Sequence, residues 1–187
     1  MQVEVCEADV PHLEQMLLRG ELDVALLFGE TRHPKIEYRQ IASEEIVLLA
    51  GKKTALAQRI PSGSTIGLRE AANERFILPV QSVDRRRYFD ELLASCAVKP
   101  DIAMLCDNID SAKRACAGCN MVMLSPFISL LCDSGSMQKL SHYHLGTDAY
   151  LPPFYIAYAK DAPLAPHSET LFHLLGNRFR AMTAYRV

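Results

Sequence analysis

Concentrated positive charge is scarce in this sequence of 187 residues. Lysine and arginine total 20 against 22 aspartate and glutamate, a formal net charge of -2, and no stretch gathers the basic residues along one face. A domain that grips a nucleic acid duplex normally shows a basic footprint, so the composition argues against a DNA-binding element within these residues. The densest basic cluster, residues 85–87, has acidic neighbours and is interpreted as the solvated start of a helix rather than a phosphate site.

Long apolar runs and targeting signals are lacking too. The longest apolar stretches, such as residues 121–124, are far too short to span a bilayer. The chain starts without the basic region and apolar core of a secretion signal. Its 6 cysteines follow no disulfide-scaffold spacing. We therefore expect a cytoplasmic protein with reduced thiols and no membrane partner.

Catalytic motifs are equally scarce. The sequence contains no phosphate-cradling glycine loop, no nucleophile elbow and no zinc-protease helix motif, so we predict no enzyme and no cofactor. Cys116 and Cys119 form a C-x-x-C pair at the end of an expected helix, where the helix dipole raises a thiol pKa. We interpret both as ordinary structural thiols, with cysteine-based redox sensing as the alternative.

Possible zinc ligands qualify by residue type alone. A structural zinc site needs four ligands, and the candidates Cys106, Cys132, His142 and His144 are not grouped by a recognisable spacing. His142 and His144 are separated by one residue and would chelate as strand neighbours, but we interpret them as surface histidines. The sequence therefore predicts no metal site.

Short apolar runs alternate with amphipathic segments along the chain. The expected strands are residues 3–8, 23–28, 45–50, 75–79, 102–106, 121–124 and 154–158. The expected helices are residues 10–19 with Asp9 as N-cap and Gly20 as terminator, 84–97, 110–117 ending at Gly118, and 168–183. Residues 30–40 and 127–150 read as loops. Strands that alternate with helices predict an α/β fold with parallel sheets, and the first three elements predict a right-handed βαβ unit.

Four segments in this order resemble the regulatory domain of LysR-type transcription regulators. They match the family patterns "L..G.LD.A", "L..E.LVLV", "R….D..F…G..P.I" and "V..G.G..LLP". The segments are residues 7–26, 41–57, 87–102 and 110–126. Lys53-Thr54 stands where the family has His-Pro, and Asn120 replaces a glycine, a mild change because asparagine tolerates positive φ.

This resemblance implies a two-lobed α/β fold similar to type 2 periplasmic binding proteins. Each lobe would be a small, mostly parallel sheet flanked by helices, with lobe one at residues 1–51 and 154–187 and lobe two at residues 52–153. The family's winged helix-turn-helix, linker helix and first regulatory strand and helix have no counterpart here, so we expect a fragment or a truncated reading frame. An open sheet edge in lobe one would favour self-association.

The resemblance also implies a small-molecule effector bound between the lobes, where strand ends and helix starts converge. Asp9 and Asp107 facing that cleft would favour a cationic or polyhydroxylated effector. For Asp9 helix capping is the alternative role, for Phe28 core packing, and for Asp107 or Asn108 capping of the following helix. The predicted effector-binding residues are Asp9, Val10, Phe28, Gly29, Pro79, Cys106, Asp107 and Asn108.

The expected function is therefore effector sensing within a LysR-type regulator, as a homodimer or higher oligomer. DNA would be reached only through a DNA-binding domain absent from this chain. A free-standing cytosolic small-molecule-binding protein is the first alternative, and an enzyme of the same two-lobed fold is the second. An upstream reading frame for a winged helix would separate the first two, and substrate turnover would establish the third.

Overall fold

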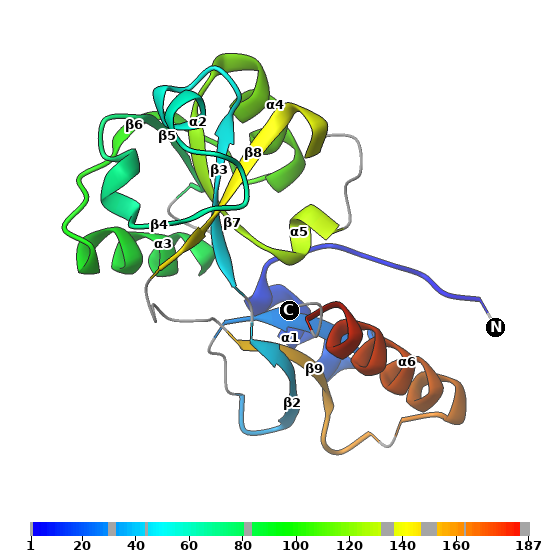
Figure 1. Cartoon of the computed structure of the whole chain (residues 1–187). Helices are drawn as coiled ribbons and strands as arrows, with labels where there is room; N and C mark the ends of the chain where they lie inside the picture. Colours follow the sequence, from blue (N-terminus) through cyan, green and yellow to red (C-terminus); the bar gives the residue numbers. More distant parts are fainter. Residues whose placement is uncertain are drawn as a thin grey trace. The chain divides into compact units, whose positions relative to one another are not determined.

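The chain folds into two compact units. One comprises residues 1–44 and 152–187, and the other comprises residues 45–151 (Figure 1). The computed structural model describes residues 2–29, 33–43, 45–80, 84–131, 137–146, 153–162 and 164–183. We call the two parts unit 1 and unit 2 and describe each by itself.

The described strands of unit 1 form an antiparallel sheet of three. β9 (Pro153–Ala159) lies in the middle, with β1 (Ala25–Phe28) on one side and β2 (Ile36–Ser43) on the other. Both outer strands run antiparallel to β9. We expected parallel strands here, but β1 has only one described neighbour, which comes from the distant C-terminal part of the chain.

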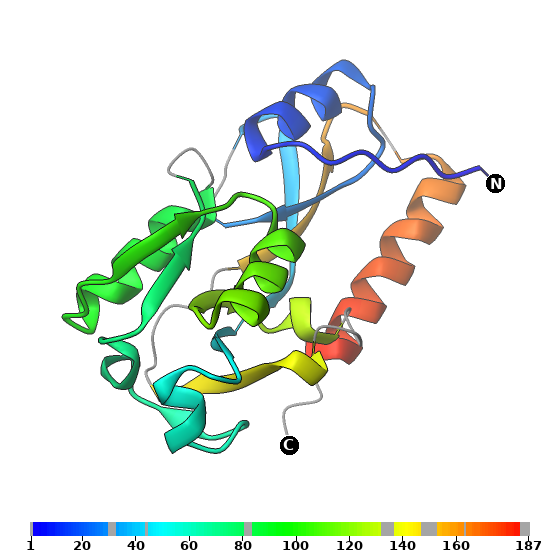
Figure 2. The same ribbon diagram turned by 90° about the horizontal axis from the view of Figure 1, so that it is seen from above.

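Residues 2–9 form neither helix nor strand, contrary to the strand expected at 3–8. All of residues 2–9 are exposed, and the side chain of Val5 is 83% exposed. Figure 2 shows this segment as an extended blue trace that leads into the first helix. Alternation of apolar and polar residues makes a strand only where a neighbouring backbone supplies the ladder hydrogen bonds. Without that neighbour the predicted βαβ unit does not form.

Residues 36–40, the second half of a segment that we expected to be loop, belong to β2. Ile36 and Tyr38 face the unit 1 core in alternation with Glu37 and Arg39. This period of two is a strand signal, which the charged residues between the apolar ones concealed. The other segment that we expected to be loop, residues 127–150, contains a second missed strand, which is described below.

Two helices complete unit 1. The first is α1 (Val10–Arg19), and the second is α6 (Pro166–Thr183). Asp9 caps α1 by accepting the His12 N–H at 2.9 Å, and Gly20 ends it with φ 71°, so both predicted caps are confirmed. The buried core of unit 1 consists of Leu17, Ala25, Leu27, Ile36 and Ala157.

Unit 2 is built on a six-stranded mixed sheet. Its strand order is β4 (Thr65–Ile66), β8 (Leu140–Leu145), β3 (Ile46–Gly51), β7 (Val122–Pro126), β5 (Arg75–Leu78) and β6 (Asp101–Leu105). β3 pairs antiparallel with β7 and β8, and the other neighbours are parallel. The sequence-based division ended lobe one at residue 51 and so placed residues 46–51 in that lobe. In the structure these residues are β3, which is hydrogen-bonded within the sheet of unit 2.

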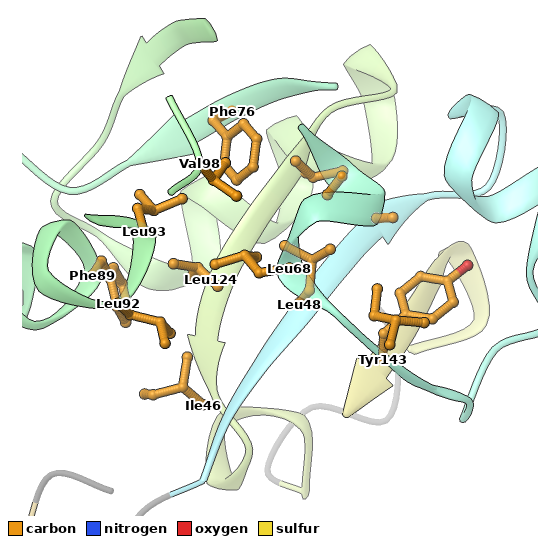
Figure 3. Close-up of a cluster of buried hydrophobic side chains, with 14 of the residues drawn as sticks. Ile46, Leu48, Leu68, Phe76, Phe89, Leu92, Leu93, Val98, Leu124 and Tyr143 are labelled. Atoms are coloured by element: carbon orange, nitrogen blue, oxygen red, sulfur yellow. The ribbon is translucent and has the colours of Figure 1, made fainter. Parts of the chain in front are cut away.

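Helices and short turns of helix cover both faces of the unit 2 sheet. They are α2 (Ala55–Arg59), η1 (Leu68–Ala71), α3 (Asp84–Ser95), α4 (Ile109–Cys119), α5 (Ile128–Leu131) and η2 (Met137–Lys139). One core packs around Leu48, Phe76, Phe89 and Tyr143 (Figure 3). The other packs around Val47, Leu49, Cys116 and Met123. Because both faces are covered, every residue of β3 is buried, as its unbroken apolar run predicts.

Two sequence-based boundaries in unit 2 need correction. β8 lies inside the segment expected to be loop, where Leu140 and Tyr143 provide the buried positions. α4 does not end at Gly118 but continues to Cys119, and Asn120 takes the left-handed conformation with φ 52°. The cap is therefore the asparagine in place of the family's glycine, one of the few residues that tolerate it.

Candidate functional site

A hollow opens in unit 2 where strands β5, β6 and β7 end and helices α3 and α4 begin. It is shallow: its roughly 270 Å³ includes open solvent, and only about 10 Å³ of that space can hold the centre of a water molecule. The carboxyl ends of parallel strands and the amino ends of helices are the usual place for ligands in α/β folds. The lining residues are Ile77, Leu78, Pro79, Arg85, Phe89, Cys106, Ile109, Ala112, Met123, Leu124 and Pro126.

Arg85 is the charged residue among those lining side chains. Its guanidinium donates to the carbonyl oxygen of Asp107 on the turn that leads into α4. Burial lowers the pKa of Arg85, and the nearby charge of Asp107 opposes that shift. An arginine still keeps its proton at neutral pH, and its five N–H donors exceed what one carbonyl accepts. The hollow therefore combines apolar walls with one cationic donor.

Arg86 does not line the hollow but is hydrogen-bonded to Pro79, which does. Only 7% of the residue is exposed, and its guanidinium donates to the Pro79 carbonyl oxygen and to Asp90 Oδ1, both at 2.8 Å. The expectation that residues 85–87 form a solvated cluster is wrong for Arg86. It is correct for Arg87, whose side chain is 63% exposed and lies over the Tyr88 ring.

The structure brings the predicted site residues of unit 2 together. Pro79 and Cys106 both line the hollow, and the Cys106 N–H donates to the Leu78 carbonyl oxygen at 2.9 Å. Asn108 caps α4 through its side-chain oxygen, which accepts the Ser111 N–H at 2.9 Å. Asp107 is exposed and contributes the carbonyl that Arg85 binds. Their effector contacts stay predictions.

The four predicted site residues of unit 1 have local roles. The Asp9 carboxylate caps α1, and Val10 packs against the unit 1 core. Phe28 meets Phe154 edge to face, with ring centroids 5.9 Å apart. Gly29 has φ 98° and donates its N–H to the Pro153 carbonyl oxygen at 3.0 Å. None of these four lines the hollow in unit 2, so their part in effector binding stays a prediction.

Sequence reasoning missed Arg85, Phe89 and Met123 in the hollow. The signal for Arg85 was present, because it lies four residues before Phe89 and seven before Leu92 on α3. Residues at this spacing share one face of a helix. Arg85 therefore had to lie on the buried stripe.

The C-x-x-C pair is a structural feature. Cys116 is fully buried, and burial raises the pKa of its thiol to about 12. Its Sγ donates to the Met121 carbonyl oxygen at 3.0 Å, whereas Cys119, the last residue of α4, is exposed. A thiol that stays protonated is a poor nucleophile, so the structural interpretation of Cys116 holds.

The described residues offer neither a metal-binding cluster nor a membrane-spanning helix. Within those ranges, no three His, Cys, Asp or Glu side chains cluster closely enough to hold a metal ion. No described helix is both long and apolar enough to cross a bilayer. Cys132, one candidate zinc ligand, lies outside the described residues.

Comparison with solved structures defines the class of fold. HinK, a LysR family transcriptional regulator from Pseudomonas aeruginosa, superposes with a TM-score of 0.78 at 17% identity, over 95% of this chain and 60% of HinK. The BenM effector binding domain with its effector benzoate gives 0.74 at 17% identity, over 97% and 78% of the two chains. The effector binding domain of QuiR in complex with shikimate gives 0.72 at 16% identity, over 92% and 77%. The two-lobed α/β effector-domain fold is thereby confirmed.

The sequence places the chain in one family. Residues 1–180 match the LysR substrate binding domain, and the chain belongs to that family, which consists of regulatory rather than enzymatic domains. Because the match runs almost from end to end, these 187 residues hold no separate DNA-binding domain. A search of curated protein sequences found no significant match.

Proposed function

We propose that this chain senses a small organic anion for a LysR-type transcription regulator. The observation that carries the proposal is the apolar hollow with Arg85 at its wall, at the strand and helix ends where α/β folds bind ligands. The anionic group of the effector would bind Arg85. Its apolar body would contact Phe89 and Met123 of unit 2.

An anionic effector replaces the cationic or polyhydroxylated one that the sequence suggested. That suggestion depended on two free carboxylates at the site, Asp9 and Asp107. The Asp9 carboxylate instead caps a helix, and Asp107 lies beside the positive charge of Arg85. An acid with an apolar body matches both properties of the hollow, because a carboxylate forms a charge-assisted hydrogen bond with a guanidinium and the other lining side chains are largely apolar. Benzoate and shikimate, which the BenM and QuiR domains bind, are both organic anions.

Effector binding would act by changing how the lobes are held. In an intact regulator that change would reach DNA through a separate DNA-binding domain, and the protein would work in the cytoplasm.

We also propose a homodimer in which two domains lie side by side and antiparallel. Support for it comes from exposed apolar side chains on the edge strand β6, where Ile102 is 44% and Leu105 is 53% exposed. Light scattering of the Ile102→Asp variant, with Asp101→Asn as control, tests the dimer.

A thermal-shift screen of small organic acids, amines and sugars tests the proposed effector class. An anion at about 100 times its Kd stabilises the fold by about 2.7 kcal/mol, which raises the Tm by roughly 5–11 °C for a chain of this size. We expect Arg85→Gln to abolish this shift. The matched control is Arg87→Gln, which removes the same charge from the same helix but from an exposed position.

Stabilisation by amines or sugars alone would refute the anion class. Equal shifts for wild type and Arg85→Gln would refute the role of Arg85 and of the hollow. Turnover of any ligand in the screen would contradict the assignment to sensing. Both variants lose one positive charge from α3, but Arg85→Gln also removes the hydrogen bond to the Asp107 carbonyl oxygen, so a difference between them does not arise from net charge.

A further inference from the structure

Two histidines lie on the same face of strand β8, away from the hollow. His142 and His144 are both half-buried, and Tyr143 between them points into the opposite core (Figure 3). The two imidazole centroids are 5.8 Å apart, with the ring planes at 83°. A metal ion held 2.0–2.1 Å from one nitrogen of each ring brings the centroids to roughly 5–6.5 Å. The rings therefore already have a separation that chelation requires.

His144 is oriented by a carboxylate. Its Nδ1 lies 2.8 Å from Glu45 Oε1, at the start of β3, and the two residues are 99 positions apart in sequence. An ionised carboxylate only accepts hydrogen bonds, so in the neutral ring Nδ1 carries the proton and Nε2 carries the free lone pair. A carboxylate on the other ring nitrogen is the usual partner of a metal-binding histidine.

His142 is held in a similar way by a hydroxyl. Its Nδ1 lies 3.3 Å from Ser62 Oγ, and the same oxygen accepts the His142 backbone N–H at 3.0 Å. His142 Nε2 lies close to Gly63, 3.9 Å from where a Cβ would be, and a glycine has no side chain there to cover the nitrogen.

We propose that His142 and His144 bind one divalent transition metal ion through Nε2 of each ring, as a two-imidazole site open to solvent. Imidazole ligands suit Ni²⁺, Cu²⁺ and Zn²⁺. Glu45 is a positioning residue, because it acts through His144. No third ligand joins the pair among the described residues, so water or a small exogenous ligand completes the coordination. The site neither depends on the effector hollow nor shares a residue with it.

Calorimetric titration of the untagged chain with NiCl₂ at neutral pH tests the site. We expect one Ni²⁺ per chain, and affinity at least about tenfold weaker in His142→Gln and in His144→Gln, the order of effect seen when a metal site loses a ligand or its orienting partner. Glu45→Gln should weaken Ni²⁺ binding while both imidazoles remain. His173→Gln is the matched control, since His173 is an exposed histidine on α6, with an exposed glutamate oxygen 4.0 Å from its Nε2.

Imidazole NMR of the wild-type protein keeps the proposal testable should a variant fail to fold. Substoichiometric Ni²⁺ should broaden the His142 and His144 signals before that of His173. Absence of binding, undiminished binding in both glutamine variants, or first broadening at His173 would each overturn the site. Loss of the effector response with intact Ni²⁺ binding would instead concern only the hollow.

Discussion

Replacing Arg86 by methionine separates the structural support of the hollow from its chemistry. The Arg86 guanidinium is the donor to the buried Pro79 carbonyl oxygen, and its aliphatic stem is enclosed within unit 2. Methionine keeps most of the stem packing but leaves that carbonyl without its donor, which costs about 1–3 kcal/mol. The Asp90 carboxylate is 47% exposed and returns to water, so its loss adds at most about 1 kcal/mol. We expect a total of about 2 kcal/mol.

Urea unfolding followed by far-UV circular dichroism measures this loss. With a slope of about 2 kcal/mol per molar, the midpoint should fall by about 1 M while the slope stays unchanged. Arg87→Met removes the same charge one residue further along α3, from a side chain that is 63% exposed. It should change stability by no more than about 0.5 kcal/mol. Equal midpoints for the two variants would show that the Arg86–Pro79 bond contributes nothing.

Two other predictions concern β3 and β8. Gly51→Ala should cost about 1–3 kcal/mol in urea unfolding, because its Cβ would lie 2.6 Å from the Cys116 carbonyl oxygen and 2.9 Å from Asn120 Cα; Gly67→Ala, with no atom within 4 Å, is the control. His142 has a pKa below its ordinary value of 6.5 in the fold, so the unfolded chain takes up its proton first and stability falls as the pH drops below 6.5. His142→Gln should therefore lose less stability than wild type between about pH 7.5 and about pH 5.5, and an equal loss would contradict the sign of the shift.

The parts of the fold that follow from local pattern were predictable. The unbroken apolar run of β3 and the helical spacing of apolar residues in α3 can each be seen within the segment itself. The caps of α1 are also local, because Asp9 and Gly20 act on backbone groups within one turn. These elements were placed within a few residues.

Strand pairing was not predictable in the same way. Residues 2–9 and β2 both alternate, yet only β2 is a strand, because β9 lies beside it and supplies its hydrogen bonds. β9 is more than a hundred residues further along the chain. Whether neighbouring strands run parallel or antiparallel depends on such distant partners as well. The sequence analysis expected a parallel βαβ unit and therefore did not predict the antiparallel sheet of unit 1.

At the site, the helical period of α3 decides which way each arginine points, and residues from other elements decide what it binds. Three consecutive arginines occupy three environments, because successive residues of a helix point about 100° apart. Arg85 and Arg86 precede Phe89 by four and three residues and so fall on the buried side of α3, whereas Arg87 precedes the exposed Glu91 by four. The helical period alone therefore predicts which arginines turn toward the core. What each one binds depends on Asp107 and Pro79, which reach α3 from the ends of neighbouring strands, and only the folded sheet brings those carbonyls there.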